Sequence, residues 1–79
     1  MKTSVEISYY PLSNNYLVII ENFLKALRQY EQIKIITNGM STQIFGEYDT
    51  VMNILTKEIK NPFSNPDSLF VIKIANACL

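Results

Sequence analysis

Apolar and polar side chains alternate over residues 3–10, which is the period of a strand with one buried face. The apolar side chains fall on one side and the mostly polar ones on the other: Val5, Ile7 and Tyr9 against Ser4, Glu6, Ser8 and Tyr10. Pro11 ends the pattern because proline has no N–H to donate to a neighbouring strand. The sequence therefore predicts a half-buried strand over residues 3–10.

Two longer segments repeat their apolar residues at every third or fourth position, which is the period of an amphipathic helix. The first follows three polar residues that can cap it, residues 13–15, and is predicted to run to about Tyr30. The second is predicted to begin at Asp49 or Thr50 and to end before a loop at residues 61–67. The predicted buried positions are Tyr16, Ile19, Ile20, Phe23, Leu24, Leu27 and Tyr30 in the first helix and Val51, Met52, Leu55 and Ile59 in the second.

Three further strands are predicted over residues 33–37, 42–47 and 68–75, between turn residues. The first two are joined through Asn38-Gly39, a dipeptide that readily takes the positive φ angles of a tight turn. The order β-α-β-β-α-β gives two interleaved right-handed crossovers, so we expect one α+β domain over residues 1–79 with a ferredoxin-like fold. Its antiparallel sheet has both helices on one face, the first and third strands in the centre and the fourth beside the first.

The chain is short and rich in apolar residues, with 79 residues of which 48% are hydrophobic. A domain this small buries a limited share of its surface, so we expect it to assemble into a homodimer or homotetramer. Seven basic and seven acidic residues give no net charge, and the basic ones are scattered along the sequence. This argues against a nucleic-acid-binding protein, which normally carries a basic patch.

The sequence holds few of the groups that catalysis or metal binding requires. It has no histidine and one cysteine, so the usual zinc and copper ligand sets and the commonest general base are missing. Glu6 and Glu47 suit acid–base work in principle, but no nucleophile has an evident base beside it. We expect no enzymatic activity and no cofactor. Without a signal peptide or an apolar run near the ~20 residues that cross a bilayer, a cytoplasmic protein away from the membrane is expected.

The sheet face without helices is predicted to mix polar and apolar side chains, which suits a sheet-to-sheet interface that encloses a polar pocket. Glu6 lies near the middle of a central strand on this face. It either pairs with Lys73 across the strands or serves a ligand as acceptor and counter-charge. Tyr10 and Phe45 either pack between copies or stack on a flat heterocycle. Ser8 either fills a strand position without a further role or forms a second hydrogen-bonding wall of the ligand site.

The most polar stretch of the chain reads T-N-G-M-S-T-Q-I-F-G-E-Y-D at residues 37–49. Polar groups that become buried need hydrogen-bond partners. The hydroxyl and amide side chains of this stretch therefore either satisfy the backbone of their own turn or contact a polar ligand. The residues concerned are Thr37, Asn38, Ser41 and Thr42. Met40, which lies in the same stretch, either packs against other residues or forms an apolar wall of the ligand site.

Three segments of the chain resemble the small thiamine-binding protein family. They are S-V-E-I-S-x-Y-P-L at residues 4–12, the polar stretch at 37–49, and F-V-I-K-I-A-N-A at 70–77. The resemblance covers residues 2–77. It implies a ferredoxin-like fold, sheets paired into dimers or tetramers, and a site for thiamine or its hydroxymethylpyrimidine moiety.

Thiamine joins an aminopyrimidine, which has a hydrogen-bonding edge and flat faces, to a thiazolium cation. From this chemistry we expect edge contacts from Glu6, Ser8, Thr37, Asn38, Ser41 and Thr42, and walls from Tyr10, Met40 and Phe45. The implied role is non-enzymatic: to carry, buffer or sense the vitamin. The alternative is a structural or regulatory module of the same fold whose open face binds only protein.

Overall fold

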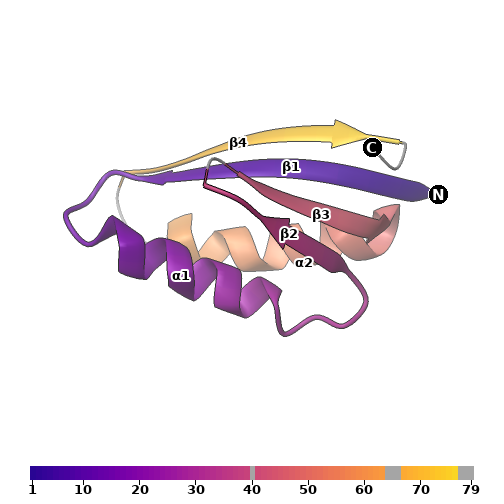
Figure 1. The fold of residues 1–79 in the computed structure, drawn as a ribbon, viewed down its shortest axis with the longest axis horizontal. Coiled ribbons are helices and arrows are strands. Elements are labelled where there is room, and N and C mark those ends of the chain that lie inside the picture. The colour runs from indigo at the N-terminus through magenta and orange to yellow at the C-terminus, as the bar shows by residue number, and fades with distance from the viewer. Residues whose placement is uncertain (40, 64–66, 77–79) are drawn as a thin grey trace.

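Two helices cover one face of a four-stranded sheet (Figure 1). The computed structural model describes residues 1–39, 41–63 and 67–76. The elements are β1 (Lys2–Pro11), α1 (Tyr16–Leu27), β2 (Lys34–Thr37), β3 (Thr42–Glu47), α2 (Tyr48–Phe63) and β4 (Ser68–Ala75). The strands lie in the order β2-β3-β1-β4, with every neighbouring pair antiparallel. The predicted ferredoxin-like α+β fold is confirmed.

The core forms where the central strands β1 and β3 meet the helices. Val5, Ile7 and Ile44 point to the helix side and are at most 2% exposed. Leu27 of α1 and Val51 of α2 are 0% exposed against them. The two-residue period of the strands and the helical period of α1 and α2 thus meet in one apolar layer.

An aromatic cluster extends the core towards the start of β4. Tyr9 stacks on Phe70 with ring centroids 4.3 Å apart, and both rings meet Phe23 of α1 at 5.3–5.4 Å. Such contacts add to the burial of apolar area, because the rings take offset and edge-on arrangements. This cluster holds Phe23, in the second half of α1, over the C-terminal half of β1.

Both helices end differently from their predicted limits. α1 ends at Leu27, and Tyr30 beyond it donates a hydrogen bond from its hydroxyl to the Glu58 carboxylate, which raises the pKa of Tyr30. α2 continues through Pro62 to Phe63, so the predicted loop is wrong for residues 61–63. Pro62 is buried, and this packing outweighs the hydrogen bond that proline cannot donate in the last turn.

The first turn of α1 is largely exposed. Tyr16, Leu17 and Val18 are 49%, 65% and 58% exposed. The prediction that Tyr16 belongs to the core is therefore wrong. The reason is that a cavity, rather than packed side chains, lies between this turn and β1.

Replacing Leu27 by alanine is expected to lower the free energy of unfolding by about 2–5 kcal/mol, the usual cost of removing a fully buried leucine side chain. Leu17→Ala in the same helix is the matched control. Because Leu17 is 65% exposed, its loss should change that free energy by less than about 0.5 kcal/mol. Urea unfolding followed by circular dichroism measures both values. Similar losses for the two variants would contradict this core.

Candidate functional site

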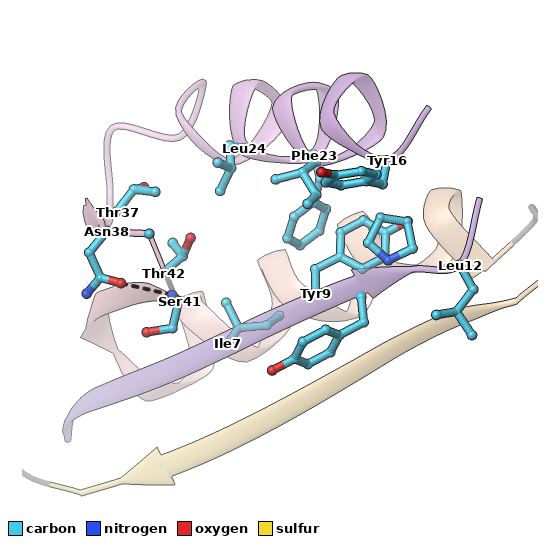
Figure 2. A pocket seen from close by; sticks show the side chains of 14 residues that line it. Ile7, Tyr9, Leu12, Tyr16, Phe23, Leu24, Thr37, Asn38, Ser41 and Thr42 are labelled. Atoms are coloured by element: carbon cyan, nitrogen blue, oxygen red, sulfur yellow. Dashed lines mark hydrogen bonds between the residues drawn. The ribbon is translucent and has the colours of Figure 1, made fainter. Parts of the chain in front are cut away.

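A cavity of about 360 Å³ opens between the end of β1, the face of α1 that is turned to the sheet, and the turn that joins β2 to β3 (Figure 2). This hairpin pocket has the size of a small-molecule site, which typically spans ~300–1,000 Å³. Its walls are aliphatic and aromatic, and include Ile7, Tyr9, Leu12, Tyr16, Phe23 and Leu24. Its polar groups come from the turn: Thr37, Asn38, Ser41 and Thr42.

The strand register explains why the turn delivers its hydroxyl groups to this side of the sheet. Thr42 lies opposite Thr37 in β2 and opposite Ile7 in β1. Residues that face each other in antiparallel strands point to the same side of the sheet. Because Ile7 belongs to the core, Thr42 points to the helix side as well.

The turn between β2 and β3 is closed by two hydrogen bonds. The Asn38 N–H donates to the Ser41 carbonyl oxygen at 3.0 Å, and the Ser41 N–H donates to Asn38 Oδ1 at 2.9 Å. Neither Asn38 nor Gly39 has a positive φ, so the predicted turn geometry is wrong here. The Asn38 side chain supplies the closure instead, which is one of the two roles predicted for it.

Thr42 is the most enclosed of the polar residues from the turn, with 6% of its surface exposed. Within the described part of the chain its hydroxyl has no hydrogen-bond partner. Every fully buried polar side-chain atom in that part of the chain does have a partner, so the Thr42 hydroxyl is not fully buried. The Thr42 hydroxyl therefore reaches the space between α1 and β1, as Figure 2 shows. Only water or a ligand can satisfy it there.

No charged side chain lines the hairpin pocket among the described residues. The carboxylate of Glu6 contacts the lining indirectly: Ser41, which lines the pocket, donates a hydrogen bond from Oγ to Glu6 Oε2 at 3.3 Å. An uncharged and largely apolar cavity favours a neutral, flat ligand with a hydrogen-bonding edge.

Glu6 itself lies on the open face of the sheet, in a second cavity of about 190 Å³ that we name the sheet-face pocket. Its carboxylate pairs with Lys73 Nζ at 3.5 Å, across directly opposed positions of β1 and β4. The predicted Glu6–Lys73 ion pair is thus present. Both side chains are substantially exposed, at 39% and 78%, so solvent screens the pair. Gln43 and Phe45 of β3 complete this pocket with neighbouring backbone and aliphatic groups.

Within one copy of the chain, the residues predicted for one ligand site fall into two groups. Thr37, Asn38, Ser41, Thr42 and Tyr10 border the hairpin pocket, whereas Glu6 and Phe45 line the sheet-face pocket. Ser8 is on the open face opposite Val71 and lines neither pocket. Met40 lies outside the described residues. For Thr42 against Glu6 and Phe45 the division follows from the strand period, which sends neighbours in sequence to opposite faces. Tyr10 is opposite Leu69 on the open face but borders the hairpin pocket near the end of β1.

Sequence reasoning missed the contribution of α1 to the hairpin pocket. Tyr16, Ile20, Phe23 and Leu24 all line it. Their three- and four-residue spacing places them on one helix face, but the same spacing marks core residues. A cavity under that face leaves no signal in the periodicity.

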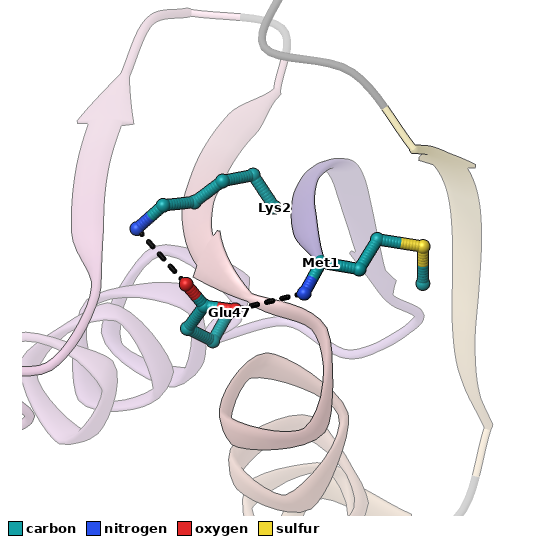
Figure 3. A network of polar contacts seen from close by, with 3 residues as sticks. All are labelled: Met1, Lys2 and Glu47. Carbon is teal, nitrogen blue, oxygen red and sulfur yellow. Dashed lines mark hydrogen bonds and ion pairs between the residues drawn. The ribbon is translucent and has the colours of Figure 1, made fainter.

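Glu47 lies outside both pockets, at the end of β3 that is remote from the turn (Figure 3). Its carboxylate accepts a hydrogen bond from the N-terminal ammonium of Met1 at 3.0 Å and pairs with Lys2 Nζ at 3.1 Å. The terminal ammonium first, and then Lys2, lower the pKa of Glu47. Glu47 therefore joins the ends of β1 and β3.

Within the described residues, no helix is long and apolar enough to cross a membrane. The same residues contain no group of three or more His, Cys, Asp or Glu side chains placed to hold a metal ion.

No protein-family model matches this chain, and no curated protein matches it. Several solved structures are similar to it. Protein SP2199 from Streptococcus pneumoniae has a TM-score of 0.89 and 21% identity, over 100% of this chain and 90% of that one. A candidate thiamine biosynthesis/salvage protein from Thermotoga maritima has a TM-score of 0.84 and 14% identity, over 98% and 85%. A domain of unknown function, DUF77, from Bacillus cereus has a TM-score of 0.81 and 14% identity, over 98% and 77%. At these identities the similarity shows a shared fold.

The pairing of Glu47 predicts a pH dependence of stability. Because the pKa of Glu47 is lowered on folding, the pairing stabilises the fold at pH values above the pKa that Glu47 has in the unfolded chain. This stabilisation is lost as the pH falls through the pKa that Glu47 has in the folded protein. An NMR titration of the Glu47 carboxyl group should give a pKa below that of an unpaired glutamate. Lys2→Met and high salt should both raise it, because the pair is exposed to solvent. Titration at the ordinary glutamate pKa in low salt would contradict the pairing.

Proposed function

We propose that this protein binds thiamine or its hydroxymethylpyrimidine moiety in the hairpin pocket, as a non-enzymatic carrier, buffer or sensor in the cytoplasm. The observation that carries the proposal is the enclosed Thr42 hydroxyl in a cavity that is otherwise mainly aromatic and aliphatic. The choice of ligand is supported by the sequence resemblance described above. It is also supported by the fold shared with the Thermotoga maritima protein.

The lining matches the pyrimidine half of thiamine better than the thiazolium half. A neutral flat ring fits against apolar and aromatic walls, and its edge meets the hydroxyl groups of Thr37, Ser41 and Thr42. The cationic thiazolium finds no carboxylate in this lining and is placed at the mouth. Tyr16, which is 49% exposed there, offers its aromatic face to a cation.

In this proposal Glu6 acts through Ser41 rather than by touching the ligand. A hydroxyl has one proton to donate and two lone pairs that accept. Because Ser41 donates its proton to Glu6, its lone pairs are free to accept a hydrogen bond from the amino group of an aminopyrimidine. The carboxylate thus sets the polarity that Ser41 presents to the pocket.

The open face of the sheet is proposed to pack against a second copy. Tyr10, Ile36, Leu69 and Val71 are 43–53% exposed on this face. A patch of this kind suits a protein interface. It places the sheet-face pocket, with its Glu6–Lys73 pair, inside the assembly.

Isothermal titration calorimetry with hydroxymethylpyrimidine and with thiamine tests the proposed site. Both should give saturable heat with the wild-type chain. Thr42→Val keeps the shape of the side chain but removes its hydroxyl. It should weaken binding roughly 3- to 10-fold, since one neutral hydrogen bond is worth about 1 kcal/mol.

Two controls locate the ligand. Thr56→Val makes the same chemical change on α2, where the hydroxyl only bonds to the Met52 carbonyl oxygen, and should leave affinity unchanged. Phe45→Leu alters the sheet-face pocket and should also leave it unchanged. Loss of binding in Phe45→Leu but not in Thr42→Val would move the site to the open face. A folded wild-type chain that binds neither compound would overturn the proposal and favour the protein-binding alternative.

A further inference from the structure

The two halves of α1 are held to the rest of the protein very differently. The buried residues of this helix are Phe23, Leu24 and Leu27, and all three lie in its second half. In the first turn, the side chains of residues 16–18 are 49–65% exposed. Segments with few buried apolar contacts are the ones that open locally at a low cost in free energy. The first turn is therefore the least anchored part of α1.

The N-terminal end of α1 also lacks the features that usually stabilise a helix start. Asn15 occupies the N-cap position, but its side chain makes no capping hydrogen bond. Its Oδ1 instead accepts a hydrogen bond from the Ser13 hydroxyl at 3.1 Å. The first turn contains no acidic side chain that would complement the helix dipole. A helix start without a cap frays readily, because its first N–H groups have no partner within the helix.

This weakly held segment has a fixed point at each end. At one end, the Leu12 N–H donates to the Asp67 carbonyl oxygen at 2.9 Å, which ties the chain to the start of β4. At the other end, Ile20 packs against the hydrophobic core. Residues 12–19 can therefore move between these points without disturbing the sheet or the second half of α1.

The same segment borders the mouth of the hairpin pocket. Leu12 and Tyr16 both line the cavity and lie at the end remote from Thr42 (Figure 2). Leu12 is 66% exposed and Tyr16 is 49% exposed, so much of their apolar surface is in contact with water. A ring that occupies the cavity supplies a surface against which both side chains can pack. Removing this apolar surface from water favours a closed arrangement.

We propose that residues 12–19 form a lid, which closes over the hairpin pocket when a ligand occupies it. In the free protein the first turn of α1 and the loop before it exchange between several arrangements. The ligand selects the arrangement in which Leu12 and Tyr16 pack against it. The inference rests on the proposed function for the nature of this ligand, a flat pyrimidine ring.

The lid sets how long the ligand stays bound. A ligand enters while the lid is open, but it leaves only after Leu12 and Tyr16 have separated from it. Contacts made by the lid therefore act on the rate of dissociation and leave the rate of association nearly unchanged. A slow release of this kind suits a protein that carries or buffers its ligand.

NMR relaxation of the backbone amides tests the lid, first in the free protein. Residues 13–19 should show lower order parameters, or exchange broadening, than residues 23–27. Saturation with hydroxymethylpyrimidine should remove this difference. Equal rigidity of the two segments in the free protein would overturn the lid. Undiminished motion in a saturated complex would also overturn it and leave the proposed function intact. A lack of saturable binding would instead overturn the proposed function, and the closure with it.

Leu12→Ser removes an apolar contact of the closed lid. It should raise the dissociation rate of hydroxymethylpyrimidine about 5-fold and change the association rate by less than about 2-fold. Stopped-flow fluorescence of the tyrosines measures both rates. Motion of residues 13–19 should also persist in the saturated variant, which loss of a contact to a rigid rim would not cause.

Leu17→Ser is the matched control, because it makes the same chemical change in the first turn of α1. Leu17 is 65% exposed and does not line the hairpin pocket. Both rates should therefore equal those of the wild-type chain. Equal acceleration of dissociation by the two variants, or an effect of Leu12→Ser on association alone, would contradict the lid.

Discussion

The side-chain alternation of β1 is the constraint on which the rest of the structure depends. β1 pairs with both β3 and β4, so its register determines which side of each neighbour meets the helices. Val5 and Ile7 are buried on that side, and Glu6 between them is turned to the open face. A slip of one residue would exchange the two sets, placing a carboxylate in the core. The burial of two aliphatic side chains thus fixes the geometry of both pockets.

The same alternation separates the two pockets and also connects them. The Thr42 side chain lies on the helix side of the sheet and lines the hairpin pocket, whereas the side chains of Gln43 and Phe45 lie on the open face and line the sheet-face pocket. Ser41, at the turn just before β3, borders the hairpin pocket and bonds to Glu6 on the open face. A polar contact therefore runs from the proposed ligand site to the face proposed for assembly. Groups at the end of a thin sheet can serve both sides because only one layer of backbone lies between them.

Most of the fold was predictable from the sequence, because periodicity reports which face of an element is buried. The strands at residues 42–47 and 68–75 and the order of all four strands were predicted correctly. Local exceptions were not: Pro62 continues α2 because it is buried, and Asn38 closes its turn through its side chain instead of a positive φ. In both, a specific tertiary or side-chain contact outweighs a general preference.

The candidate site was predictable only in part. The polar turn was identified, and the Glu6–Lys73 pair was one of two stated possibilities. The hairpin pocket was missed because the apolar residues of a helix have the same sequence spacing whether they pack in a core or line a cavity. Tyr16 shows this: its spacing fits the core, yet it lies half-exposed at the mouth. The position of a helix over a sheet depends on all the contacts between them, and the spacing of apolar residues in the sequence does not determine it.

The central claim is that a pyrimidine ligand occupies the helix side of the sheet, and a methyl-resolved NMR titration with hydroxymethylpyrimidine tests it most directly. Saturable shifts are expected for the methyl groups of Ile7, Leu24 and Thr42, which line the hairpin pocket. The methyl groups of Ile36 and Val71 on the open face should stay unchanged. Shifts confined to the open face, or no shifts from a folded protein, would contradict the account.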